Sequence, residues 1–234
     1  MKVYPVFALI EDRACLVVGG GAVGERKVRD LLEAGARVSV VSRELTPYLA
    51  ELADQGAIRY LGKDFTPEHL EGMVLAVGAT DDPEVNVRVS AAARERGIWV
   101  NIADAPDLCT FIVPAQIKRG PLTVAISTGG ASPALARRLR EELEELFGPE
   151  YGPYVDLLRM VREKILASRR GHPDNHALFQ RLAAGPLKQA VAERDKEWVL
   201  QVLMDSVGTV LSRETVEELV NKAMDEQPLP LIVD

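Results

Sequence analysis

Short apolar runs alternate with amphipathic stretches over the first half of the chain. The apolar runs predict β-strands, several of them hydrophobic enough to be buried on both faces, and they cover residues 14–18, 37–41, 58–61, 73–77 and 99–102. Apolar residues at helical spacing lie between them and predict helices over residues 22–34, 47–55 and 82–96. This alternation predicts an α/β domain with a doubly wound parallel sheet.

The alternation stops after Ala103. Apolar residues 111–113 and 122–126 predict two further strands outside the regular sheet. Ser132 is a typical helix N-cap and predicts a long helix over residues 134–147. This part of the chain is therefore expected to be a small α+β segment.

The last third of the chain has a helical pattern throughout. Residues 154–224 predict only helices, with breaks near Gly171, Gly185 and Ser212, and a frayed tail from Pro228. At the other end, residues 3–9 predict a short edge strand or an extended arm. We therefore expect three parts with the bounds 1–113, 114–148 and 149–234.

A glycine cluster joins the first predicted strand to the first helix. Gly19, Gly21 and Gly24 fit the pattern G-x-G-x-x-G, in which glycines permit a tight turn, close approach of a pyrophosphate and close helix packing. The helix N-terminus adds free N–H groups and a positive dipole. The pattern predicts a Rossmann-like dinucleotide site, and the alternative is a glycine-rich turn that binds nothing.

The other predicted cofactor residues follow neighbouring strands. Ligands of such sheets bind beyond the carboxyl ends of the strands, where Arg43, Glu44 and Thr80 are expected. An acid near the end of the second strand usually binds ribose hydroxyls and favours NAD. Arg43 could instead bind the 2′-phosphate of NADP, or be a solvated surface residue.

One carboxylate is a candidate catalytic base. Asp104 comes just after the fifth strand and is expected to face the cofactor, where it could take the proton that accompanies hydride transfer. Asp107 is a competing candidate. Alternatively, Asp104 only forms a turn ahead of Pro106.

A second glycine-containing segment is a candidate substrate site. It combines small residues with a helix start, and its members are Ser127, Thr128, Gly129, Gly130 and Ser132. Backbone N–H groups at such a turn could bind substrate carboxylates, with help from the arginines that follow. Simple capping of the helix is the alternative.

Composition limits the classes of function. The net charge of −7 argues against bulk binding of nucleic acid or an anionic membrane, and no apolar run reaches the ~20 residues of a membrane helix. The two cysteines, Cys15 and Cys109, favour a reducing cytoplasm over a disulfide framework. No Cys/His set has the spacing of a structural metal site, and His172 and His176 are expected in a surface loop.

Several ordered motifs together resemble those of precorrin-2 dehydrogenase, which is also the N-terminal module of siroheme synthase. The resemblance covers about residues 1–147, and its motifs lie at residues 17–27, 79–82, 101–106, 111–115 and 125–137. No methyltransferase module follows, so the resemblance is to the free-standing form.

The resemblance implies NAD-dependent oxidation of precorrin-2 to sirohydrochlorin in siroheme biosynthesis. It also implies a homodimer, built largely through the segment after the fifth strand, and some members also insert ferrous iron. The family's catalytic aspartate corresponds to Asp104, and its NAD contacts correspond to Ala22, Val23, Arg43 and Glu44. The rival hypothesis is a non-catalytic NAD-binding regulatory module, which would share the glycine loop but would not need Asp104.

Overall fold

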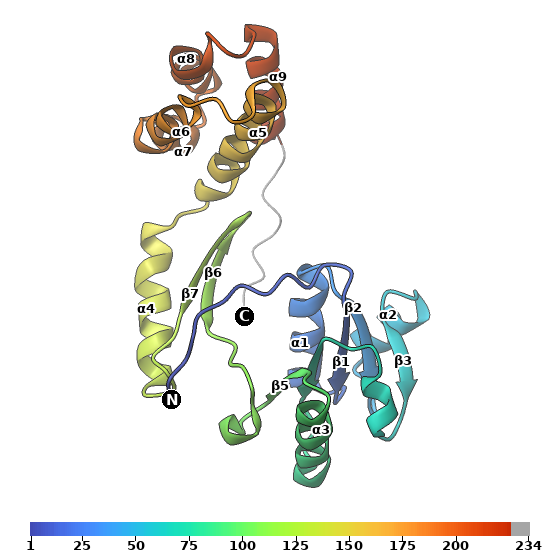
Figure 1. The fold of residues 1–234 in the computed structure, drawn as a ribbon. Helices are drawn as coiled ribbons and strands as arrows, with labels where there is room; N and C mark the ends of the chain where they lie inside the picture. The colour runs from blue at the N-terminus through green and yellow to red at the C-terminus, as the bar shows by residue number, and fades with distance from the viewer. Residues whose placement is uncertain (226–234) are drawn as a thin grey trace. The chain divides into compact units, whose positions relative to one another are not determined.

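The computed structural model describes residues 1–225, so the predicted tail from Pro228 lies outside the described residues. The chain divides into two compact units (Figure 1). One unit is Val3–Val113, and the other is Pro114–Asp234 together with Met1–Lys2. The first unit holds a parallel sheet, whereas the second holds a hairpin followed by helices.

The first unit contains a five-stranded parallel sheet. Its strands are β1 (Ala14–Val18), β2 (Arg37–Val41), β3 (Arg59–Gly62), β4 (Leu75–Gly78) and β5 (Trp99–Ile102). Its helices are α1 (Ala22–Glu33), α2 (Pro47–Asp54) and α3 (Pro83–Glu95), with short 3₁₀ turns η1 (Pro67–Leu70) and η2 (Pro106–Leu108). The strand order β3-β2-β1-β4-β5 confirms the predicted doubly wound sheet and puts its switch point between β1 and β4.

The sheet carries a hydrophobic core on each face. On one face, Cys15 and Val17 of β1 pack with Val28 of α1. On the other face, Leu16 and Val18 of β1 pack with residues of α3 and η1. Because alternate residues of a strand point to opposite faces, every one of these β1 side chains is buried. Burial on both faces explains the unbroken apolar run that predicted the strand.

Strand β5 lies at one edge of the sheet, and residues 109–111 cover its free side. The Val100 N–H donates to Thr110 Oγ1 at 2.8 Å, and the Thr110 N–H donates to the Val100 carbonyl at 2.8 Å. The Ile102 N–H donates to Cys109 Sγ at 3.2 Å. The outward N–H groups of this edge strand therefore bond to side chains instead of to another strand.

The predicted strand over residues 111–113 is wrong. The observed hairpin consists of β6 (Ala115–Arg119) and β7 (Leu122–Ile126), which pair antiparallel. The Phe111 carbonyl is occupied by Asn101 Nδ2, which donates to it at 3.1 Å. Pro114 has no N–H for a ladder, so the strand starts only after it. The second predicted strand, over residues 122–126, is confirmed.

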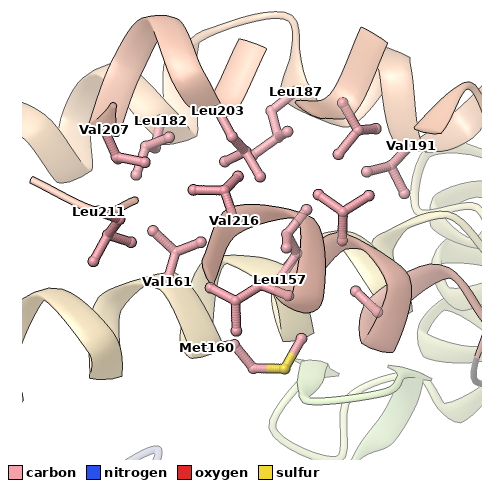
Figure 2. Close-up of a cluster of buried hydrophobic side chains, with 14 of the residues drawn as sticks. Leu157, Met160, Val161, Leu182, Leu187, Val191, Leu203, Val207, Leu211 and Val216 are labelled. Atoms are coloured by element: carbon pink, nitrogen blue, oxygen red, sulfur yellow. The ribbon is translucent and has the colours of Figure 1, made fainter. Parts of the chain in front are cut away.

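The second unit continues from the hairpin as a series of helices. These are α4 (Pro133–Leu146), α5 (Tyr151–Arg169), α6 (Asn175–Ala184), α7 (Leu187–Ala192), α8 (Lys196–Val207) and α9 (Arg213–Asp225). Helices α5 to α9 share one hydrophobic core, in which each helix contributes a buried side chain (Figure 2). One example from each helix gives the set Leu157, Leu182, Leu187, Leu203 and Val216. The predicted helical region is thus a bundle with its own core.

The helix breaks predicted from glycine, proline and serine all fall between observed helices. The structure adds a break at Arg194, which has a φ of +55°. Asp195 then caps α8, because its carboxylate accepts the Trp198 N–H at 3.0 Å.

Residues 3–9 lie in an exposed, extended arm and form no strand in the described chain. Among residues 1–225, no helix combines the length and apolarity needed to cross a lipid bilayer.

Candidate functional site

The glycine loop after β1 lies at the switch point of the sheet and is packed too closely for side chains at Gly19, Gly20 and Gly24. Gly19 has a φ of +118°, and a Cβ there would overlap the Ala79 carbonyl oxygen. A Cβ on Gly24 would overlap the Gly19 carbonyl oxygen. These glycines therefore allow the tight turn and the close seating of α1 on the strand.

Gly21 differs, because a Cβ at this position would meet no atom within 4 Å. It is the N-cap of α1, no side chain caps that helix, and Ala22 and Val23 behind it are exposed. The first N–H groups of a helix have no partners within the helix, and its dipole is positive at this end. The loop thus offers an open, positively polarised backbone surface that fits a dinucleotide pyrophosphate.

The loops after β2 and β4 border the glycine loop. A Cβ on Gly20 would overlap the Glu44 carbonyl oxygen, so the backbone of Glu44 lies directly against the loop. Thr80 Oγ1 accepts the Asp82 N–H at 2.8 Å, and this bond shapes the turn into α3. Two of the predicted cofactor residues, Glu44 and Thr80, therefore flank the glycine loop from opposite sides of β1.

Arg43 follows β2 and is paired with an acid. Its Nε lies 3.0 Å from Asp64 Oδ1, and the two side chains are 74% and 71% exposed. An ion pair this exposed is weak, so Arg43 can exchange Asp64 for another partner. The negative charge of Asp64 disfavours a 2′-phosphate beside it, which supports NAD over NADP.

Behind the loop, Glu25 of α1 is bonded to the start of α2. Thr46 Oγ1 donates to Glu25 Oε2 at 2.5 Å, and Arg29 Nη2 donates to Glu25 Oε1 at 2.7 Å. The Thr46 N–H also donates to the Gly20 carbonyl at 3.0 Å. The hydrogen bond from Thr46, followed by that from Arg29, lowers the pKa of Glu25 below its ordinary value of 4.5. Sequence reasoning missed this link between Thr46 and Glu25.

Asp104 follows β5 and has a φ of +57°, in the left-handed region that aspartate, asparagine and glycine adopt most readily. Its side chain is exposed and makes no hydrogen bond or ion pair with another residue of the described chain. The preceding Ala103 N–H donates to the Gly78 carbonyl at 2.8 Å, which ties the start of the loop to the end of β4. A solvent-facing carboxylate therefore lies at the same edge of the sheet as the glycine loop.

Helix α3 holds the far end of this loop. Ser90, which is 2% exposed, donates from its hydroxyl to the Leu108 carbonyl at 2.6 Å. Arg94 Nη2 donates to the carbonyls of Asp107 at 3.0 Å and Cys109 at 3.1 Å. The sequence carried no signal for these contacts, because helix residues that bond to distant backbone have no characteristic spacing.

The predicted substrate segment, Ser127–Ser132, belongs to the second unit. Its two glycines have φ values of +61° and +81°. Ser127 Oγ accepts the Gly129 N–H at 3.1 Å, and Thr128 Oγ1 accepts the Ser132 N–H at 3.1 Å. The hydroxyls of the segment therefore bond to its own backbone and hold a compact turn.

Helix α4 begins directly after this turn. Ser132 Oγ accepts the Leu135 N–H at 3.2 Å, which confirms the predicted N-cap. Three arginines of α4 pair with glutamates four residues later, as Arg137–Glu141, Arg138–Glu142 and Arg140–Glu144. All three arginines therefore pair with acids along their own helix.

Of the two histidines predicted in a surface loop, His172 lies between α5 and α6, whereas His176 lies in helix α6. His172 Nδ1 lies 2.6 Å from Arg169 Nη2. Within residues 1–225, no group of three or more His, Cys, Asp or Glu side chains is arranged to hold a metal ion.

Several curated proteins that resemble this chain are siroheme synthases. Siroheme synthase from Nitrosomonas europaea is 46% identical over 218 residues, which cover 92% of this chain and 45% of that protein. Siroheme synthase from Methylobacillus flagellatus is 50% identical over 165 residues, which cover 70% of this chain and 35% of that protein. The chain is a relative of the siroheme synthases. It spans less than half the length of these two curated relatives.

Two family models match consecutive parts of this siroheme synthase relative. Residues 6–115 match the family described as putative NAD(P)-binding, and residues 119–146 match the family described as sirohaem biosynthesis protein central. A solved structure described as SirC, precorrin-2 dehydrogenase, has a TM-score of 0.72 and 28% identity. The match covers 86% of this chain and 98% of that chain. The first unit is therefore a Rossmann-like NAD-binding domain.

Proposed function

We propose that this chain oxidises precorrin-2 to sirohydrochlorin with NAD, within siroheme biosynthesis. One observation carries the proposal: an exposed carboxylate, Asp104, stands at the same sheet edge as an open dinucleotide cradle. The siroheme synthase relatives and the precorrin-2 dehydrogenase structure support the choice of substrate. A module that only senses NAD would have no use for that carboxylate.

The reaction removes a hydride and a proton from the substrate and yields NADH, sirohydrochlorin and H⁺. When bound, NAD supplies the hydride acceptor. Asp104 accepts or orients the proton, and its exposure lets that proton pass on to water. Because its loop is bonded at both ends, the backbone that carries this carboxylate is held in place before the substrate arrives.

The cofactor contacts follow from the loop geometry. We assign the pyrophosphate to the backbone of Gly19, Gly21, Ala22, Val23 and Gly24. Arg43 and Glu44 would bind the adenine ribose, and Thr80 would border the cofactor from β4. Asp64 beside Arg43 favours NAD, so an affinity for NADP above that for NAD would contradict this assignment.

We further propose that the segment Ser127–Ser132 binds acetate and propionate groups of the substrate through backbone N–H groups other than those of Gly129, Ala131 and Ser132, which bond within the turn. The turn is held by its own hydroxyls and ends at the N-terminus of α4, where the helix dipole favours an anion. The exposed arginine pairs of α4 can exchange a glutamate for a substrate carboxylate.

The active form is proposed to be a homodimer in the cytoplasm. Helix α4 exposes 47% of Leu135 and 66% of Leu146, and every β7 residue is partly or fully exposed. A symmetric partner would cover these apolar surfaces. Light scattering tests this proposal, and a monomer mass throughout the micromolar range would contradict it. Both cysteines are free, as expected in a reducing compartment.

Ferrous iron insertion is a second proposed activity. Entry of iron into sirohydrochlorin releases pyrrole protons, and Asp104, whose carboxylate is exposed, is suited to accept them. In this step ferrous iron would be a substrate.

A single assay separates these hypotheses. Purified protein is mixed anaerobically with precorrin-2 and NAD, and both NADH formation and the tetrapyrrole spectrum are followed. Turnover supports the dehydrogenase, whereas NAD binding without turnover supports the regulatory module. Addition of ferrous iron to the finished reaction then tests insertion against a protein-free control.

A further inference from the structure

We propose that Cys109 is a positioning residue for Asp104, an inference that rests on the proposed function. Cys109 Sγ lies 3.4 Å from the Ile102 carbonyl oxygen and 3.4 Å from the Ala105 carbonyl oxygen. These two carbonyls lie on either side of Asp104 in the chain. The sulfur therefore spans the turn that carries the carboxylate.

The same sulfur accepts hydrogen bonds at the base of the turn. The Ile102 N–H donates to Cys109 Sγ at 3.2 Å, and Asn101 Nδ2 lies 3.6 Å from it. A thiol has one hydrogen, so it can donate to one of the two carbonyls at a time while it accepts from the N–H groups. The Cys109 side chain thus bonds both to the end of β5 and to the turn that follows it.

Cys109 is itself held in place. Arg94 of α3 donates to its carbonyl at 3.1 Å, and its neighbour Thr110 bonds to Val100 of β5 through both its N–H and its hydroxyl. Both anchors lie on regular secondary structure. The sheet and α3 therefore fix the position of the sulfur. The sulfur in turn contacts the residues on both sides of Asp104.

Loss of the thiol should lower the rate of dehydrogenation and leave NAD affinity unchanged. Without sulfur, the Ile102 N–H loses its partner and the Asp104 turn can adopt other conformations. The NAD cradle follows β1 and includes none of these atoms. We expect Cys109→Ala to lower kcat by about tenfold to a hundredfold, the range expected for a misplaced catalytic group, with an unchanged NAD dissociation constant.

Two further variants make the test specific. Cys109→Ser keeps a donor and an acceptor and should recover part of kcat. Thr110→Val removes one anchor of Cys109 but keeps the bond from the Thr110 N–H to the Val100 carbonyl, so it should lower kcat less than Cys109→Ala does. All variants are compared by circular dichroism, NAD titration and stopped-time conversion of precorrin-2.

A double-mutant cycle decides whether Cys109 acts through Asp104. In an Asp104→Asn background, Cys109→Ala should cost no further activity, because the residue it positions is already inactive. An equal loss in both backgrounds would show a general structural defect and overturn the proposal. Full activity of Cys109→Ala in an active enzyme would also overturn it.

Hydrogen exchange gives a readout that does not need turnover. The Ile102 amide should exchange faster in Cys109→Ala than in the wild type, and Cys109→Ser should restore part of its protection. Equal exchange of the Ile102 amide in the wild type and in Cys109→Ala would overturn the proposed role of the Cys109 sulfur. A wild-type chain that converts no precorrin-2 would instead overturn the proposed function.

Discussion

The loops after β1 and β5 lie at the same edge of one sheet but are shaped in opposite ways. The β1 loop is shaped by missing side chains, because Gly19 and Gly24 bring backbone against backbone. The β5 loop is shaped by added side chains, because Ser90, Arg94 and Cys109 bond to its carbonyls. One loop offers N–H groups to an anion, and the other presents a carboxylate.

This difference shows how a single sheet edge can serve two chemical needs. A pyrophosphate requires close approach to backbone, which only glycine permits at the tightest positions. A proton acceptor requires a side chain held at a fixed position, so its loop needs supports from outside the loop. Substitutions in the β1 loop and in the β5 loop should therefore have different effects on stability, NAD affinity and rate.

The largest effect is expected at Asp104. Asp104→Asn keeps the shape and tolerates the φ of +57°, but it cannot accept a proton. The dehydrogenation rate should fall by about 10²–10⁴-fold, or about 3–5 kcal/mol of barrier, with NAD affinity unchanged. Conversion of precorrin-2 at saturating NAD measures it. A normal rate in Asp104→Asn would mean that the residue only orients the substrate.

Two controls accompany this variant. Asp104→Gly accepts the left-handed conformation and should be as slow as Asp104→Asn, whereas Asp104→Ala should add about 1 kcal/mol of backbone strain. Asp107→Asn should stay nearly as active as the wild type, because Asp107 is held through its backbone carbonyl.

The next effect is on folding and concerns the glycine loop. Gly24→Ala puts a methyl group against the Gly19 carbonyl and should lower the free energy of unfolding by about 1–3 kcal/mol. Gly21→Ala is the matched control, because its methyl group meets open space, and it should cost less than about 1 kcal/mol. Urea unfolding followed by circular dichroism compares them. Equal losses would contradict the close packing at Gly24.

A smaller effect separates binding from folding within the same loop. Gly21→Asp places a carboxylate where the pyrophosphate is expected, in space that is open in the structure. NAD affinity should fall at least tenfold, or about 1.4 kcal/mol, while the fold persists. Titration with NAD measures the change. Wild-type affinity in this variant would remove the loop from the cofactor site.

The smallest effect is a pH dependence behind the loop. The pKa of Glu25 is lowered in the folded state, so its bonds stabilise the fold above the ordinary carboxyl value of 4.5 and are lost as pH falls through the folded value. Glu25→Gln should lower the free energy of unfolding by under about 1 kcal/mol at pH 7. The difference from the wild type should vanish in acid, and chemical unfolding at several pH values measures it. A difference that persists below the folded pKa would contradict this assignment.

Much of the sheet and the glycine loop could be predicted because their signals are local. Strand β1, its glycines and α1 follow one another within a short stretch, and burial on both faces leaves an unbroken apolar run. Asp104 could be predicted from its place after β5. Its left-handed backbone was not predicted, and it lies in a turn in which the Ala105 N–H donates to the Ile102 carbonyl at 3.3 Å.

The errors share one physical origin. Residues 111–113 have strand-like composition, yet their neighbours bond to β5 through Thr110 and Cys109. The break at Arg194 was missed because the sequence around it continues a helical pattern. In both places, side-chain to backbone bonds outweigh the local propensity that sequence reasoning measures.

The covered edge of β5 also has a consequence for association between chains. An open edge strand is a template for pairing with a strand of another molecule, and such pairing leads to aggregation. Here the outward N–H groups of Val100 and Ile102 are already occupied. A strand of another molecule could pair with β5 only after it had displaced residues 109–111. This edge of the sheet is therefore protected from intermolecular strand pairing.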